Sequence, residues 1–197
     1  MGLFILVVGL ILFLGAHVFV TFRGARAGLI ERIGEGAYRG AFSLVAIVGL
    51  VATVWGFSLY RQTGWVDVWY PPTFLRHVTV ALVWPAIILL VAAYLPGRIK
   101  NAAKHPMLAG LKLWAFAHLL SNGDLGGIIL FGSVLTWGIY ARVAAKRRGE
   151  VVGRNPTLIV GPGWTNDAIA IVAGTVLYLA LGYWFHPAFI GVPVFGR

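Results

Sequence analysis

Residues 2–22 read GLFILVVGLILFLGAHVFVTF, an almost unbroken apolar run that is long enough to cross a lipid bilayer as one helix. The run lacks the basic start of a signal peptide, so we expect it to be a retained span. Further apolar segments occupy residues 38–60, 74–95, 106–121, 125–142 and 165–185. The sequence therefore predicts an all-α polytopic membrane helix bundle with about six transmembrane segments, in a single domain over residues 1–197.

The composition excludes a water-soluble enzyme. Apolar residues make up 59% of the chain and charged residues 11%, with a mean hydropathy of +0.86. Soluble domains carry roughly 45–50% apolar and about 25% charged residues. The chain has no cysteine, so disulfides, thiolate metal sites and cysteine nucleophiles are also excluded.

Basic residues gather in alternate loops. The chain has 16 Lys and Arg against six Asp and Glu. Three loops that should share one side of the membrane hold Arg23, Arg26, Arg32 and Arg39, then Arg98, Lys100 and Lys104, then Arg142, Lys146, Arg147, Arg148 and Arg154. The other side receives Arg61, Arg76 and Arg197. By the positive-inside rule these three loops are cytoplasmic, both termini are periplasmic, and the charge surplus sets topology rather than binding nucleic acid.

The fourth segment is short for a span. Its 16 residues would cover about 24 Å as a helix, against the ~30 Å of a hydrocarbon core. Only Asn122-Gly123-Asp124 separates it from the fifth segment. The pair is therefore either two spans or a re-entrant hairpin whose turn stays inside the membrane. Small residues spaced for close helix approach occur at Gly36 and Gly40 and at Ala170 and Gly174.

Two histidines lie inside apolar segments, where ionisable groups are costly and often functional. They are His17 in the first segment and His118 in the fourth, with Asn122 four residues later on the same helix face. A neutral imidazole is a good ligand for iron or zinc. The alternative is that each ring forms a hydrogen bond between helices.

The other polar candidates are expected at interfaces or helix ends. His77, His105 and His186 lie near segment ends, where contact with headgroups is the simpler interpretation. Asp124 should cap the fifth segment and Asp167 the sixth, by accepting backbone N–H groups. The sequence contains no nucleophile elbow, phosphate loop or zinc-protease motif.

Two blocks of the chain resemble the NnrU family of integral membrane proteins. The first block contains His17, Arg23, Gly34, Tyr38 and Arg39. The second is more specific and contains Lys104-His105-Pro106-Met107, Gly110, Trp114, Ala117-His118 and Asn122-Gly123-Asp124, with a terminal pair at His186-Pro187. The usual form of the second block begins with Arg, and Lys104 departs from it. The likeness covers nearly the whole chain.

The resemblance implies a cofactor, a metabolic role and a cellular location. Bacterial members are associated with denitrification and nitrogen-oxide metabolism, which implies the bacterial inner membrane. A relative, 15-cis-ζ-carotene isomerase, holds haem b between two histidines that align with His17 and His118. These two residues are therefore the expected axial ligands of a haem iron. The isomerase carries a cysteine three residues before its second histidine, where this chain has Ala115.

By resemblance, the chain is a haem b protein acting in nitrogen-oxide metabolism or in haem-dependent cis–trans isomerisation. Its expected partners are the lipid bilayer, a hydrophobic small molecule or nitric oxide, and a redox partner that the sequence does not identify. One alternative is a membrane methyltransferase-like enzyme, since a His-Pro pair before a membrane helix also occurs in such families. Another is a non-enzymatic assembly or regulatory factor for a reductase complex.

Overall fold

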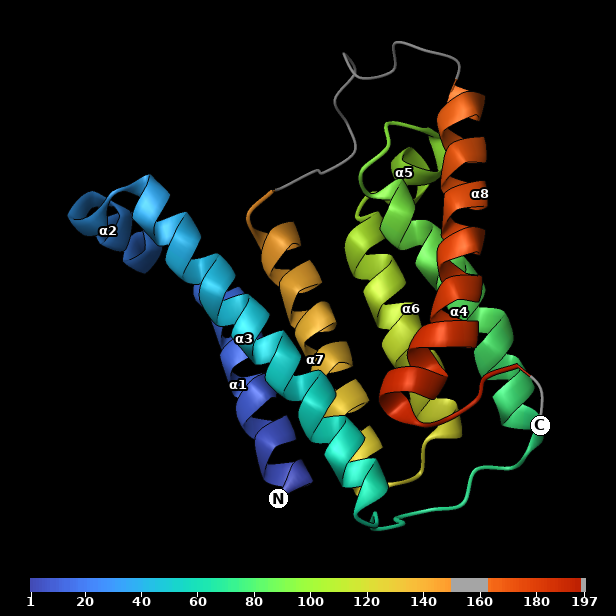
Figure 1. Cartoon of the computed structure of the whole chain (residues 1–197). Helices are drawn as coiled ribbons and strands as arrows, with labels where there is room; N and C mark the ends of the chain where they lie inside the picture. The colour runs from blue at the N-terminus through green and yellow to red at the C-terminus, as the bar shows by residue number, and fades with distance from the viewer. Residues whose placement is uncertain (150–162, 196–197) are drawn as a thin grey trace. The chain divides into compact units, whose positions relative to one another are not determined.

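The computed structural model describes residues 1–149 and 163–195, and it confirms the all-α prediction. The helices are α1 (Gly2–Phe19), α2 (Arg23–Ile33), α3 (Glu35–Gln62), α4 (Phe74–Ala92), α5 (Arg98–Ala103), α6 (Pro106–Ser121), α7 (Leu125–Arg147) and α8 (Gly163–Ala180), followed by a π-helical segment, Leu181–Ile190 (Figure 1). Within the described ranges the extended pairing is limited to an isolated bridge between Asp67 and Asp124. Helices therefore satisfy the backbone, as a membrane interior requires.

Five helices of the described chain are long and apolar enough to cross a membrane, so this is a multi-pass membrane protein. They are Gly2–Phe19, Glu35–Gln62, Phe74–Ala92, Leu125–Arg147 and Trp164–Ile190. Their outer faces carry large apolar side chains, such as Leu44, Ile47 and Val51 of α3, which are 59–64% exposed. Exposed apolar surface of this extent suits lipid rather than water. The predicted fourth span is α6, whose 16 residues place it below the length of the other five.

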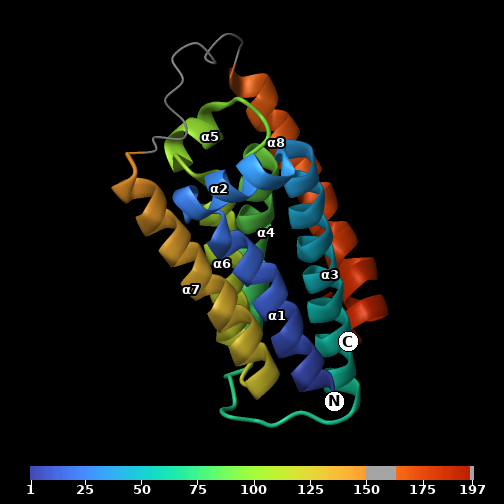
Figure 2. The ribbon, with the colours of Figure 1, turned by 90° about the vertical axis from the view of Figure 1, so that its left-hand side faces the viewer.

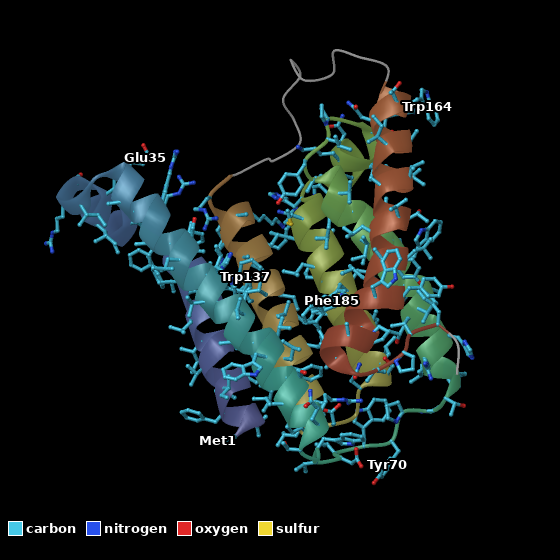
Figure 3. All side chains as sticks on the ribbon, in the orientation of Figure 1. Met1, Glu35, Tyr70, Trp137, Trp164 and Phe185 are labelled. Carbon is cyan, nitrogen blue, oxygen red and sulfur yellow. The ribbon has the colours of Figure 1, made fainter. Side chains whose placement is uncertain are left out.

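The described chain forms two compact units. Unit 1 comprises Met1–Val66 with Phe189–Gly191, and unit 2 comprises Asp67–Ala188 with the residues after Gly191. In unit 1, α1 and α3 pack side by side along their length, and α2 joins them at one end (Figure 1). Figure 3 labels Met1 and Glu35 at the two ends of this hairpin.

Glycines spaced by seven residues hold α1 against α3. Gly2 and Gly9 on α1, and Gly49 and Gly56 on α3, each approach the backbone of the other helix. A Cβ at Gly49 would lie 2.6 Å from the backbone nitrogen of Phe13. Small residues at a repeating position let helix backbones approach closely in a membrane, where packing replaces the hydrophobic effect.

Of the two pairs of small residues noted in the sequence, one lies at a helix contact and the other does not. At Gly36 and Gly40 an added Cβ would meet no described atom within 4 Å, so the described residues make no close helix approach at this pair. The pair on α8 is confirmed, because Ala170 is buried and Gly174 packs against Ile88 of α4. Spacing alone is insufficient, because the same pattern on an outward face meets no partner.

Unit 2 is built around α4 and α6. Helix α6 contacts both α4 and α7, and α8 packs on α4 (Figure 2). Hydrogen bonds tie these helices together. The hydroxyl of Thr79 donates to the carbonyl of Ala117 over 2.7 Å, and that of Tyr178 donates to the carbonyl of Val80 over 3.0 Å. Figure 3 labels Tyr70 and Trp164 at opposite ends of this unit, as expected for interfacial aromatic residues.

Two aspartates act as helix caps, one of them at an unexpected helix. Asp124 caps α7 as predicted, because its Oδ1 accepts the N–H of Gly127 over 2.8 Å. Asp167 does not cap its own helix as expected: its carboxylate accepts the N–H groups of Arg98 and Ile99 at 3.2 and 3.0 Å. It thereby fixes the start of α5, a short helix that the apolar pattern did not predict. The carboxylate thus ties the α4–α6 connection to α8.

Candidate functional site

His118 is the most enclosed histidine of the apolar segments. It lies near the end of α6 and is 8% exposed. Its Nδ1 is 2.8 Å from the carbonyl oxygen of Trp114, one turn earlier. The Trp114 ring lies 4.8 Å from the imidazole, and the Phe131 ring of α7 stacks on it at 4.6 Å with an interplanar angle of 25°. Apolar rings therefore enclose an imidazole whose orientation a backbone carbonyl holds.

Unit 2 brings a second imidazole to His118. The ring of His186 lies 6.1 Å from that of His118, with 24° between the planes. Its Nδ1 is buried and has no hydrogen-bond partner among the described residues. His186 belongs to the π-helical segment, a form that occurs frequently at functional sites. The position of His186 near a segment end predicts an interfacial residue, and the terminal His-Pro pair is the sequence signal that singles it out. Its proximity to His118 comes from the tertiary structure.

His17 has the same local arrangement in unit 1. Its Nδ1 is 2.7 Å from the carbonyl oxygen of Phe13, and the Phe13 ring lies 4.5 Å from the imidazole. Phe42 of α3 contacts it edge-on at 5.3 Å. In both units, then, a histidine bonds the carbonyl of the aromatic residue four positions earlier and contacts that residue's ring.

This arrangement suits a metal ligand. A carbonyl oxygen can only accept, so the Nδ1 that faces it carries the proton, and the neutral ring then keeps its lone pair on Nε2. Metal-ligating histidines characteristically donate their other ring N–H to a carbonyl or carboxylate, which fixes the tautomer and the ring orientation. The donor chemistry and the aromatic surroundings of His17 and His118 fit the axial ligands of a haem iron.

The secondary candidates Asn122 and Asp124 belong to the turn that follows α6. The side-chain nitrogen of Asn122 donates to the carbonyl of His118 over 2.8 Å, so Asn122 supports the helix end that carries His118. Asp124 is 3% exposed. The carbonyl of Gly123 accepts the N–H groups of Val68 and Trp69, at 2.9 and 3.1 Å. The segment before α4 therefore covers the turn.

Of the remaining two histidines, His105 lies away from His118 and His77 is exposed. His105 is 8% exposed and precedes the first residue of α6, where its carbonyl accepts the N–H of Ala109. Thirteen helical residues correspond to about 20 Å, so His105 and His118 occupy opposite ends of α6. His77 is exposed on α4 and lines an open cavity of about 620 Å³ with Arg76 and Ser121. In the described ranges no three His, Asp or Glu side chains are grouped as a metal site.

Ala115 lies three residues before His118 and is fully buried. A methyl group offers no lone pair, so Ala115 contributes packing rather than a ligand.

Comparison with known proteins identifies one family. The family model described as "NnrU protein" matches residues 5–194, which is nearly the whole chain. Neither the curated proteins nor the solved structures contain a match to the sequence or the fold.

Proposed function

The chain belongs to the NnrU family, and from this premise we propose that it is a haem b-binding membrane protein with His17 and His118 as the axial ligands of the iron. The observation that carries the proposal is the arrangement common to the two histidines, in which Nδ1 is held by the carbonyl four residues earlier. One such histidine is an ordinary helix feature. Two of them, each in an apolar helix and each beside an aromatic ring, match the way in which proteins orient metal-ligating imidazoles, and this match supports the proposal.

We further propose that the protein acts in nitrogen-oxide metabolism or haem-dependent isomerisation at the bacterial inner membrane, with periplasmic termini. A haem with two histidine ligands supports electron transfer, whereas a labile ligand opens the iron to nitric oxide or a substrate. Phe13 and Phe42 contact the imidazole of His17, and Trp114 and Phe131 contact that of His118, so the surroundings of each ring favour an apolar ligand. The family setting and these surroundings support the proposal together.

An absorption spectrum of the detergent-purified protein tests it. We expect a Soret band and the sharp visible bands of low-spin haem in the reduced state, either as purified or after reconstitution with haem b. Nitric oxide should perturb the Soret band if one axial ligand is labile. A protein that stays colourless after reconstitution would contradict the proposal, and its co-purification with a reductase would favour an assembly factor instead.

A further inference from the structure

Two buried polar atoms of unit 1 lack a hydrogen-bond partner in the described part of the chain. They are the hydroxyl of Tyr38 on α3 and Nε of Arg26 on α2. Tyr38 is 6% exposed, and the Arg26 guanidinium lies 5.4 Å from the centre of its ring. An unpaired buried donor destabilises the fold, and a charged one does so more strongly. The guanidinium lies over the Tyr38 ring, so the two side chains that carry these atoms are neighbours and a single ligand at this contact would complete both.

The pair is connected to His17 by a row of aromatic contacts. The ring of Phe42 lies 5.3 Å from the imidazole of His17 on one side and 6.5 Å from the ring of Tyr38 on the other. All four side chains belong to unit 1. Arg26 lies in the loop whose basic residues predict the cytoplasmic side, so the row runs from an apolar helix toward the membrane surface.

The two side chains, a guanidinium and a phenol, offer donors that favour an anionic ligand. A guanidinium offers only N–H donors and a fixed positive charge, and the phenol supplies an O–H beside it. Carboxylates and phosphates accept such charge-assisted bonds. The nearest acid along the chain from Tyr38 does not meet this need, because Glu35 pairs with Arg39 over 2.6 Å. No described acid, Glu31 included, bonds either unpaired atom, so the anion comes from outside this part of the chain.

We propose that Arg26 and Tyr38 bind a carboxylate of the porphyrin whose iron His17 ligates; this inference rests on the proposed function. A porphyrin carboxylate is charged, so it is costly in hydrocarbon and stable near the surface beside a cation. In this proposal His17 would ligate the iron, and the Arg26–Tyr38 pair would bind the carboxylate and thereby determine which edge of the porphyrin faces the cytoplasm. A lipid phosphate offers the same acceptor chemistry and is the competing source.

Titration of the purified apoprotein with haem b and with its dimethyl ester, in which both carboxylates are blocked, tests the proposal. We expect Arg26→Gln and Tyr38→Phe each to weaken haem b binding by about ten-fold or more, since a hydrogen bond to a charged group contributes about 1.5–3 kcal/mol. Neither substitution should change the affinity for the ester. Arg32→Gln removes the same charge from an exposed position of α2 and should leave both affinities unchanged.

Other outcomes overturn the inference in recognisable ways. If the substitutions weaken the binding of haem b and of the ester equally, the pair only supports the fold. Arg26→Lys keeps the charge and serves as the control for a folding defect. It should retain part of the preference for haem b over the ester. Unchanged haem b binding with loss of co-purified lipid phosphorus would identify a lipid site. If the unmodified protein binds haem b and its ester equally, the inference fails while the proposed function stands. If it binds neither, both fail.

Discussion

The regions around His17 and His118 have the same local geometry and different means of support. In each, Nδ1 bonds the carbonyl of an aromatic residue four positions earlier. Around His17 the partner helix is brought close by glycines, and the neighbouring ring is Phe42. Around His118 the helices are joined by hydrogen bonds, and a second imidazole, His186, lies beside the ring. One helical turn therefore orients an imidazole, whereas tertiary packing decides what faces it.

The largest effect should come from removing either imidazole. His17→Ala and His118→Ala should each lose an axial bond, shift a low-spin spectrum toward high-spin and lower haem occupancy. The structural cost should be small, because intramembrane hydrogen bonds average about 0.6 kcal/mol in one system. Absorption spectra of the reduced and oxidised proteins measure the change, with the exposed His77→Ala as control. Full haem with an unaltered Soret band in both variants would refute the assignment and make His105 the next candidate.

A second test concerns the covered turn at the end of the His118 helix. Because the chain lacks cysteine, single cysteines can be introduced cleanly. Asn122→Cys should react slowly with a membrane-impermeant thiol reagent, since the turn lies under the segment that contains Trp69. Tyr70→Cys, at a position 81% exposed in that same segment, should react rapidly. Equal labelling rates in intact cells would show that the turn is open.

The third test separates glycines that pack from glycines that do not. A Cβ at Gly56 falls on the backbone of Leu6, so Gly56→Ala should push α1 from α3 and lower the free energy of unfolding by about 1–3 kcal/mol. Gly40→Ala meets no described atom and should stabilise α3 by roughly 0.5–1 kcal/mol through backbone entropy. Thermal unfolding in detergent measures both. A similar effect at the two positions would mean that glycine packing does not hold the His17 region.

The smallest effect is expected at His186. His186→Phe keeps a ring beside His118 and removes only the second imidazole, so the spectrum should stay low-spin and haem b affinity should change by less than about two-fold, well under the ten-fold that 1.4 kcal/mol represents. Titration with haem b, followed by spectroscopy, measures both quantities. A shift to high-spin would identify His186, rather than His17, as the partner of His118.

The order of residues along the chain was enough to predict the long helices and one of the helix caps. Runs of apolar residues predicted the long helices, because a span must bury about 20 residues regardless of its neighbours. Asp124 was predicted as a cap, because the cap and the N–H that it accepts are three residues apart. The i−4 bond of His17 and His118 is local in the same sense. The cap and the two i−4 bonds depend on residues within about one helical turn, and each span depends on one continuous run of residues.

Contacts between residues that are far apart in sequence could be identified only from the tertiary structure. Asp167 binds the start of α5, about seventy residues earlier, and His186 reaches His118 although 68 positions separate them. The glycine repeat of α1 became meaningful only with the matching repeat on α3, whereas Gly36 and Gly40 had the right spacing and no partner. Sequence thus determined which long segments are apolar helices, because this property arises along the chain, whereas the short helices α2 and α5 and the partner of Asp167 were not predicted. Only the tertiary structure decided which faces meet, because that choice depends on the packing of segments far apart in sequence.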